Sequence, residues 1–436
     1  MGGAAGCGSG PGKSSRGAKG GPRAGARRTL RIAQFSHFLP AYDAWFDGEY
    51  IVRWGEDHDV SVVMDRVPFG EIASRADAEV AAEGPHDIFG FVDAPSVYED
   101  DVIDHRDLLD QITDKFGKVI PLVERCVINP KTGKVFGCPH YWVANPTHYR
   151  VDLWNQVQAG LTPRTWNDLL LAAPKLKALG HPLGIGLSQE GDSNYSLISL
   201  LHAHGASLQD ETGTLTINRS ATVEAVKLVA ALFKAGLGDD VFAWDGSSNN
   251  RALLDGRASL ILNGVSAIRA VEIQRPDLAA NIALAPFPVV SSRESERAVY
   301  VVGVNVIWKF SKNQDLATQF LADLAQVQRE ALIHSGFYNL PPFQGQTAEF
   351  AQVMAHDDGA RPPEKYALLA DATSWSTNIG HPGPGNAACM DTFNQFLVPK
   401  MFAAAARGEM SAEEAVKAAE ARMQPIFAKW RERGKI

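Results

Sequence analysis

Short apolar segments that alternate with amphipathic ones are the feature that most constrains this chain. Residues 30–35 and 60–64 have the apolar, β-branched character of buried strands, and an aromatic segment at 42–54 separates them with helical spacing. A third short strand is expected at 87–92. Strand–helix–strand alternation of this kind predicts an α/β fold in which mostly parallel sheets carry helices on both faces.

The second half of the sequence is richer in helical signals. Helices dominate from residue 165 onward, and further strands are expected at 259–262 and 298–307. The last segments, 387–404 and 412–430, are strongly helical, and apolar side chains in the final one recur on one face. A chain of 436 residues is long enough for two or more packed units.

Charge is distributed unevenly along the chain. The first 31 residues contain seven basic and no acidic side chains, and the whole chain has a net charge of −8, so the remainder carries −15. An acidic body is a poor partner for phosphate backbones, so nucleic-acid binding is not expected. Residues 1–29 are rich in Gly and Ser and predict a flexible tether, either a solvated linker or a segment attracted to anionic membranes.

The four cysteines do not form a metal or redox motif. They are Cys7, Cys126, Cys138 and Cys389, and no Cys-x-x-Cys pair occurs. Cys126 and Cys138 flank a turn-rich run at 129–134, so a hairpin there would bring them face to face. Both a disulfide and two buried thiols are consistent with this spacing. Cys389 falls in a predicted helix and is expected to be an inert core thiol.

Catalytic motifs are missing from the sequence. It contains no His-Glu-x-x-His helix and no Gly-x-Ser-x-Gly elbow. Residues 7–14 imitate a phosphate-binding loop, but Cys7 replaces the first glycine and no strand precedes it. We therefore expect a non-enzymatic protein that needs no cofactor and no metal.

Four groups of segments, in order along the chain, carry a resemblance to a known family. They are Gly133-Lys-Val-Phe-Gly-Cys-Pro139 with Tyr149-Arg-Val-Asp-Leu-Trp154, Thr162-Pro-Arg-Thr-Trp-Asn-Asp-Leu169 with Lys177-Ala-Leu-Gly180, Leu254-Asp-Gly-Arg-Ala-Ser-Leu260 with Asn263-Gly264, and Val302-Gly303 with Ser311-Lys-Asn313 and residues 317–321. Together they resemble the family 1 solute-binding proteins of ABC importers, the group that contains maltose-binding protein. The sequence departs from that pattern at Arg150, where relatives have Asn, and at Ser266, where many have an aromatic residue.

This resemblance implies a two-lobed fold of the type II periplasmic-binding-protein class with a ligand cleft between the lobes. One lobe would comprise residues 30–138 and 303–340, and the other residues 139–302 and 341–436. The implied function is the extracytoplasmic substrate-binding component of an ABC importer, a monomer that binds a carbohydrate and contacts the transmembrane permease subunits. Residues 4–7 also resemble a lipobox, which would make Cys7 the lipid-anchored residue of a periplasmic or cell-surface lipoprotein. No apolar signal core precedes Cys7, so a plain tether residue is the alternative.

Candidate ligand contacts follow from where polar and aromatic residues fall relative to strands and crossings. Loops after parallel strands line the ligand crevice of α/β folds, which selects His37, Phe91 and Asp93. Each has a structural alternative: His37 and Asp93 as helix or turn caps, and Phe91 as core. Trp142 lies at the first crossing between lobes, where the floor of the cleft is expected.

Further candidates lie in the second implied lobe. Asp192, Asn194 and Tyr195 form a polar lead-in to a helix at the place where relatives contact sugar, with a simple N-cap as the alternative. The remaining candidates come from a polar loop, from the end of a strand and from a late helix start, and they are Trp244, Asn250, Asn263, Ser266 and Asn386, with Trp375 as a weaker one. Two rival functions stay open: the same fold binding glycerol phosphate, a polyamine or another small polar solute, and a glycan-active enzyme on an unrelated α/β fold.

Overall fold

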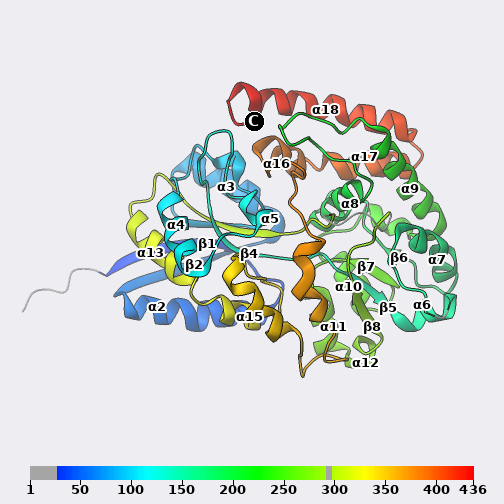
Figure 1. Ribbon diagram of the computed structural model, residues 1–436, viewed down its shortest axis with the longest axis horizontal. Helices are drawn as coiled ribbons and strands as arrows, with labels where there is room; N and C mark the ends of the chain where they lie inside the picture. Colours follow the sequence, from blue (N-terminus) through cyan, green and yellow to red (C-terminus); the bar gives the residue numbers. More distant parts are fainter. Residues whose placement is uncertain (1–26, 159, 291–296) are drawn as a thin grey trace, which may run out of the picture.

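Two mixed β-sheets organise the computed structural model, which describes residues 27–158, 160–290 and 297–436. The first sheet has the strand order β2-β1-β3-β9-β4, and the second has the order β6-β7-β5-β8. Each sheet lies in its own half of the molecule, flanked by helices (Figure 1), and we call these halves the first and second lobe. The strands are β1 (Arg28–Phe35), β2 (Val60–Val67), β3 (Ile88–Phe91), β4 (Cys138–Trp142), β5 (Thr147–Arg150), β6 (Leu183–Gly184), β7 (Leu260–Leu262), β8 (Ile282–Ala285) and β9 (Val302–Ile307).

The pairing of the strands differs in detail from the expected mostly parallel arrangement. β1 pairs in parallel with β2 and β3, and β6 pairs in parallel with β7. β9 is antiparallel to both β3 and β4, and β5 is antiparallel to both β7 and β8. The sheets are mixed because the chain crosses between the lobes and returns, so strands such as β9 enter their sheet from the opposite end.

Helices cover both faces of each sheet, as the alternating sequence predicts. Those associated with the first sheet are α1 (Pro40–Trp45), α2 (Ile51–Asp57), α3 (Ile72–Ala82), α4 (Arg106–Phe116), α5 (Pro121–Glu124), α13 (Gln314–Leu324) and α14 (Gln328–His334). The others are α6 (Val151–Val157), α7 (Trp166–Ala178), α8 (Gly191–Ala203), α9 (Ser220–Gly236), α10 (Ser248–Leu254), α11 (Ser266–Gln274), α12 (Pro276–Ala279), α15 (Gln344–Met354), α16 (Ala387–Asn394), α17 (Leu397–Ala406) and α18 (Ala412–Glu432). Among the described residues, no helix is long and apolar enough to cross a membrane.

The predicted aromatic segment at 42–54 forms the core of the first lobe. Tyr42, Trp45, Phe46 and Trp54 are all buried. Trp54 packs edge-on against Phe320 of α13 at a centroid distance of 5.0 Å. Aromatic side chains remove large apolar areas from water, so this cluster stabilises the face of the sheet on which the segment lies.

Local helix-start signals also form as the sequence indicates. Thr165 caps α7 by accepting a hydrogen bond from the Asp168 N–H, while the Asp168 side chain accepts from the Thr165 N–H. Ser411 and Glu414 form the same reciprocal pair at the start of α18. These capping boxes satisfy backbone donors that a helix leaves free at its N-terminus.

The C-terminus connects the two lobes. α18 runs along the second lobe and ends close to the first (Figure 1). There the Lys435 ammonium lies 3.3 Å from Glu99 and 2.6 Å from Asp100, and the Asn129 amide donates to the Lys435 carbonyl. The last residues therefore contact the first lobe, although most of α18 packs on α9 and α17.

The predicted hairpin between Cys126 and Cys138 is present, but the disulfide is not. Ile128 pairs with Val135 across the turn, and both cysteines are buried free thiols. Burial raises the pKa of the Cys138 thiol to about 12, which keeps it protonated and unreactive. Cys389 is likewise a buried free thiol, and Cys7 lies outside the described residues.

Candidate functional site

A cavity of about 480 Å³ lies between the two lobes. The first lobe contributes the loop before α1, the turn after β2 and the loop after β3. The second lobe contributes the start of α8, the loop before α10 and the segment from α16 to α17. The side chains that matter most for its chemistry are Phe38, Phe69, Phe91, Asp93, Tyr98, Glu190, Tyr195, Ser247, Phe393 and Phe396.

Aromatic rings make up much of the cavity wall. Phe38 and Phe69 pack at a centroid distance of 5.1 Å on the first-lobe side. Opposite them, Tyr195 of α8 and Phe393 of α16 pack at 5.0 Å. Flat aromatic faces exclude water and pack on the C–H surfaces of a small molecule, as in most ligand pockets.

One hydrogen bond joins the lobes across the cavity. The Tyr195 hydroxyl, from α8, donates to the Asp93 carboxylate in the loop after β3 at 2.6 Å. Burial raises the pKa of Asp93 to about 8, and the Tyr195 hydrogen bond offsets only part of that rise. Asp93 is therefore a carboxyl group whose ionisation depends on what occupies the space beside it.

The start of α8 brings the second lobe close to the first. The Glu190 carboxylate accepts hydrogen bonds from the N–H groups of Asp192 at 2.7 Å and Ser193 at 2.5 Å, and so caps the helix. Burial and the neighbouring Asp192 raise the pKa of Glu190. A Cβ at Gly191 would lie 3.1 Å from the Phe69 ring, so the missing side chain permits this close approach.

A polar network behind the cavity fixes α8 against the end of β7. The Asp192 carboxylate accepts from the Tyr300 hydroxyl at 2.7 Å and from the Asn249 amide at 2.9 Å. Asn263 donates to Asn249 at 3.1 Å and also contacts Asn250. Tyr300 in turn packs at 4.8 Å from the ring of Tyr195. The network thereby holds Tyr195, which lines the cavity, in one position.

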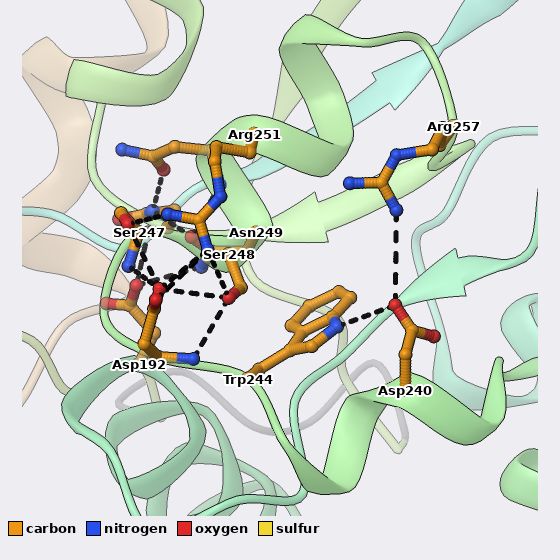
Figure 2. A network of polar contacts seen from close by, with 11 residues as sticks. Asp192, Asp240, Trp244, Ser247, Ser248, Asn249, Arg251 and Arg257 are labelled. Carbon is orange, nitrogen blue, oxygen red and sulfur yellow. Dashed lines mark hydrogen bonds and ion pairs between the residues drawn. The ribbon is translucent and has the colours of Figure 1, made fainter.

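The loop before α10 closes one side of this network. Ser247 lines the cavity, and its N–H donates to the Asp245 carboxylate at 3.0 Å. Arg251 of α10 donates to the Ser247 hydroxyl and pairs with Asp245 at 3.0 Å, so its positive charge is already compensated. Figure 2 shows Asp192, Ser247, Ser248, Asn249 and Arg251 gathered in one network, with Trp244 and Asp240 set to one side.

The structure brings several sequence candidates together. Phe91, Asp93 and Tyr195 line the cavity itself. Asp192, Asn250 and Asn263 belong to the network behind it. Loops after strands of the first lobe and the start of α8 therefore meet at this cavity.

Other candidates do not line the cavity, and most of them are buried away from it. His37 is buried, accepts from the Leu39 N–H at 3.0 Å and contacts Asn339, but it does not cap α1, which has no side-chain cap. Asn194 donates to the Phe393 carbonyl, and Trp244 donates to Asp240. Ser266 is buried in the first turn of α11.

Trp142 and Asn386 also depart from the expected arrangement. The Trp142 indole donates to the Pro341 carbonyl at 3.0 Å, and the ring lines a separate hollow with Ile120 and Met354. Asn386 accepts from two N–H groups at the start of α16 and donates to Gln209, so its amide is not directed into the cavity. Trp375, the weaker candidate, is buried.

Sequence reasoning missed six aromatic or acidic wall residues, namely Phe38, Phe69, Tyr98, Glu190, Phe393 and Phe396. Phe69 follows β2 just as Phe91 ends β3, so the same rule about strand ends could have selected it. Glu190 lies two residues before a selected candidate. Phe393 and Phe396 carry no such signal, although Phe396 has φ +53°, and bulky residues in that strained region cluster at functional sites.

The chain belongs to a family of bacterial binding proteins. The family described as "Bacterial extracellular solute-binding protein" matches residues 36–325, which is more than half of the chain. This assignment agrees with two sheets in two lobes around a cavity, and it confirms the family expected from the sequence.

Individual relatives are distant. The chain is 24% identical to a binding protein of Brucella abortus (strain 2308) over 198 residues, 44% of this chain and 47% of that protein, so it spans about half the length of that curated relative. It is 23% identical to the arabinooligosaccharide-binding protein of Bacillus subtilis (strain 168) over 294 residues, 63% of this chain and 64% of that protein.

Solved structures share the fold across almost the whole chain. The GacH receptor of Streptomyces glaucescens, solved unliganded and with acarbose, matches with a TM-score of 0.73 at 20% identity over 93% of this chain and 99% of its own. Maltose-bound T. maritima MalE3 matches with a TM-score of 0.75 at 17% identity over 91% and 99%. These similarities confirm the two-lobed α/β architecture.

Proposed function

We propose that this chain is the substrate-binding component of an ABC importer and that it binds a carbohydrate in the cavity between its lobes. The observation that carries the proposal is the cavity itself, which combines aromatic rings and carboxylates from both lobes. Aromatic faces suit the C–H surfaces of sugar rings, and carboxylates accept hydrogen bonds from hydroxyl groups. A ligand that touches both lobes stabilises the closed form, because only that form makes both sets of contacts.

The relatives support a carbohydrate over other solutes. The B. subtilis relative is named for arabinooligosaccharides, and the two solved structures hold acarbose or maltose. A glycerol phosphate would need an Arg or Lys cluster to meet its charge, yet no Lys or Arg occurs among the described residues that line the cavity. A polyamine remains the rival ligand, because carboxylates and aromatic rings are the groups that bind it.

Several accompanying statements belong to the same proposal. The protein acts outside the cytoplasm, in the periplasm or at the cell surface, is anchored to the membrane through Cys7, and works as a monomer with the transmembrane permease subunits. It releases its ligand unaltered and catalyses no reaction. The proposed lobes comprise residues 30–138 with 303–340 and residues 139–302 with 341–436, although β4 continues the first sheet to Trp142.

A thermal-shift screen followed by calorimetry tests the function. Mono- and oligosaccharides should raise the melting temperature, because a ligand that binds only the native state stabilises it by mass action. Phe69→Ala removes one cavity face and should weaken sugar binding about fivefold, since a lost aromatic contact costs roughly 1 kcal/mol. Phe310→Ala, which changes a ring that stacks on Trp308 instead, should leave the affinity unchanged.

Two results would contradict the proposal. A response to polyamines or phosphate esters without any response to sugars would remove the carbohydrate assignment. Recovery of a chemically altered sugar after incubation, detected by mass spectrometry, would support the glycan-active enzyme in its place.

A further inference from the structure

The cavity between the lobes has an unusual balance of charge. Two carboxylates, Asp93 and Glu190, are among the described residues that line it, and no Lys, Arg or His is among them. Arg251 of α10 contacts the lining residue Ser247 but is paired with Asp245. The two carboxyl groups therefore have no cationic side chain beside them in the described lining, and burial raises the pKa of both.

The two carboxylates differ in how their charge is met. Glu190 accepts two backbone N–H groups at the start of α8, where the helix dipole also favours a negative charge. Asp93 has a single polar partner among the described residues, the Tyr195 hydroxyl. A hydroxyl group cannot neutralise a carboxylate, so a cation beside Asp93 would lower the raised pKa of this group, and Asp93 would release its proton to solvent as the ion pair forms.

The walls around Asp93 favour a particular kind of cation. Phe91 and Tyr98 pack at 5.2 Å beside it on the first-lobe side, and Tyr195 and Phe393 pack at 5.0 Å on the other. An ammonium group near aromatic faces is stabilised by the negative π-surface, and the apolar part of its carrier packs on the same rings. The surroundings therefore suit a compact amine with apolar faces.

We propose that the Asp93 carboxylate receives a protonated amino group of the ligand and that the preferred ligand is an amino sugar. This inference rests on the proposed function, because it assumes that a carbohydrate occupies the cavity. The Tyr195 hydroxyl remains on the Asp93 carboxylate and orients it toward the amine. Anionic sugars such as uronic acids are disfavoured, because their carboxylates would meet Asp93 and Glu190 without a compensating cation.

A matched ligand series tests the inference on the wild-type protein at about pH 7. Oligosaccharides of one β-1,4-linked glucan backbone that carry an amine, an acetamide or a hydroxyl at carbon 2 differ only in the group of interest, and glucosamine, N-acetylglucosamine and glucose form the monosaccharide set. Calorimetry should show the amine form binding about 10- to 100-fold more tightly than the other two, the range expected for a charge-assisted hydrogen bond.

Two variants identify the group responsible. Asp93→Asn keeps the size of the side chain and a carbonyl oxygen for Tyr195 but removes the charge, so it should abolish the preference for the amine. Asp110→Asn makes the same change at an exposed position of α4 outside the cavity and should keep the preference. If the Asp93 variant does not fold, the comparison of amine with hydroxyl on the wild type still decides the inference.

The outcomes separate this inference from the proposed function. Equal binding of amine and hydroxyl forms, or an Asp93→Asn loss that is the same for both, would overturn the inference and leave carbohydrate binding intact. Binding of spermidine with no binding of any sugar would overturn both.

Discussion

His105 should make the stability of this protein fall in mild acid. The side chain is 1% exposed, and its Nε2 accepts a hydrogen bond from the Ile307 N–H in β9 at 3.0 Å. Its Nδ1 lies 3.3 Å from the Val135 carbonyl oxygen in the hairpin. These partners require a neutral ring with the proton on Nδ1, because a proton on Nε2 would face the Ile307 N–H.

The size of the effect follows from the shift of the His105 pKa. Burial lowers this pKa from 6.5 to about 4. The unfolded chain therefore binds the proton more tightly than the native chain does. The contribution of neutral His105 to the free energy of unfolding is complete above about pH 6.5 and declines as the pH falls toward 4. A shift of this size corresponds to about 3 kcal/mol in total, of which about 2 kcal/mol is lost between pH 7 and pH 5.

Urea unfolding at pH 7, 6 and 5 measures the contribution of His105. The variant His105→Gln can offer a carbonyl oxygen to the Ile307 N–H but does not titrate, so its free energy of unfolding should fall about 2 kcal/mol less than that of the wild type over this range. His356→Gln changes a histidine whose side chain is 61% exposed, and it should follow the wild type. Parallel losses in the wild type and His105→Gln would show that the protonation of His105 does not contribute, and the reasoning would fail.

Three further substitutions probe the packing of the two lobes by urea unfolding. Thr165→Ala removes the cap of α7 and should cost about 1 kcal/mol; a Thr165→Ser variant that is equally unstable would argue against the cap. Trp142→Ala should lower the free energy of unfolding by about 3–5 kcal/mol, since the ring is buried. An unchanged urea midpoint would contradict a core role for Trp142. Lys435→Met leaves the buried Glu99 carboxylate without its cation and should cost about 3 kcal/mol; no change would mean that the C-terminal contact carries no net stability.

Much of the architecture could be predicted from local sequence patterns. The strands at 30–35 and 60–64, the aromatic segment at 42–54 and the capping boxes at Thr165 and Ser411 depend on neighbours close in sequence. The structure contains these features because strand alternation, helical spacing and capping hydrogen bonds depend on residues only a few positions apart. The order of four family-like segments extended this to the two-lobed fold.

The site could be predicted from the sequence only in part. Asp93 and Tyr195 were selected from separate loops, but nothing in the sequence says that a 2.6 Å hydrogen bond joins them across 102 positions. Trp142, Asn194 and Asn386 have the right chemistry for a sugar contact, yet all three are buried and their N–H groups donate to Pro341, Phe393 and Gln209. A side chain binds a ligand best when it lines the cavity and the folded chain leaves a donor, an acceptor or a charge on it uncompensated.

By itself, the sequence determined the class of fold, the family, the acidic body and the chemical types of residue available to a ligand. The tertiary structure alone decided that phenylalanines far apart in the chain form one wall, that the sheets are mixed, and that Cys126 and Cys138 stay unpaired. It also decided that Asp93 lies in an aromatic cavity whose described lining residues include no cation. The reason is physical: composition and periodicity report local preferences, whereas burial and charge compensation depend on which distant segments the crossings bring together.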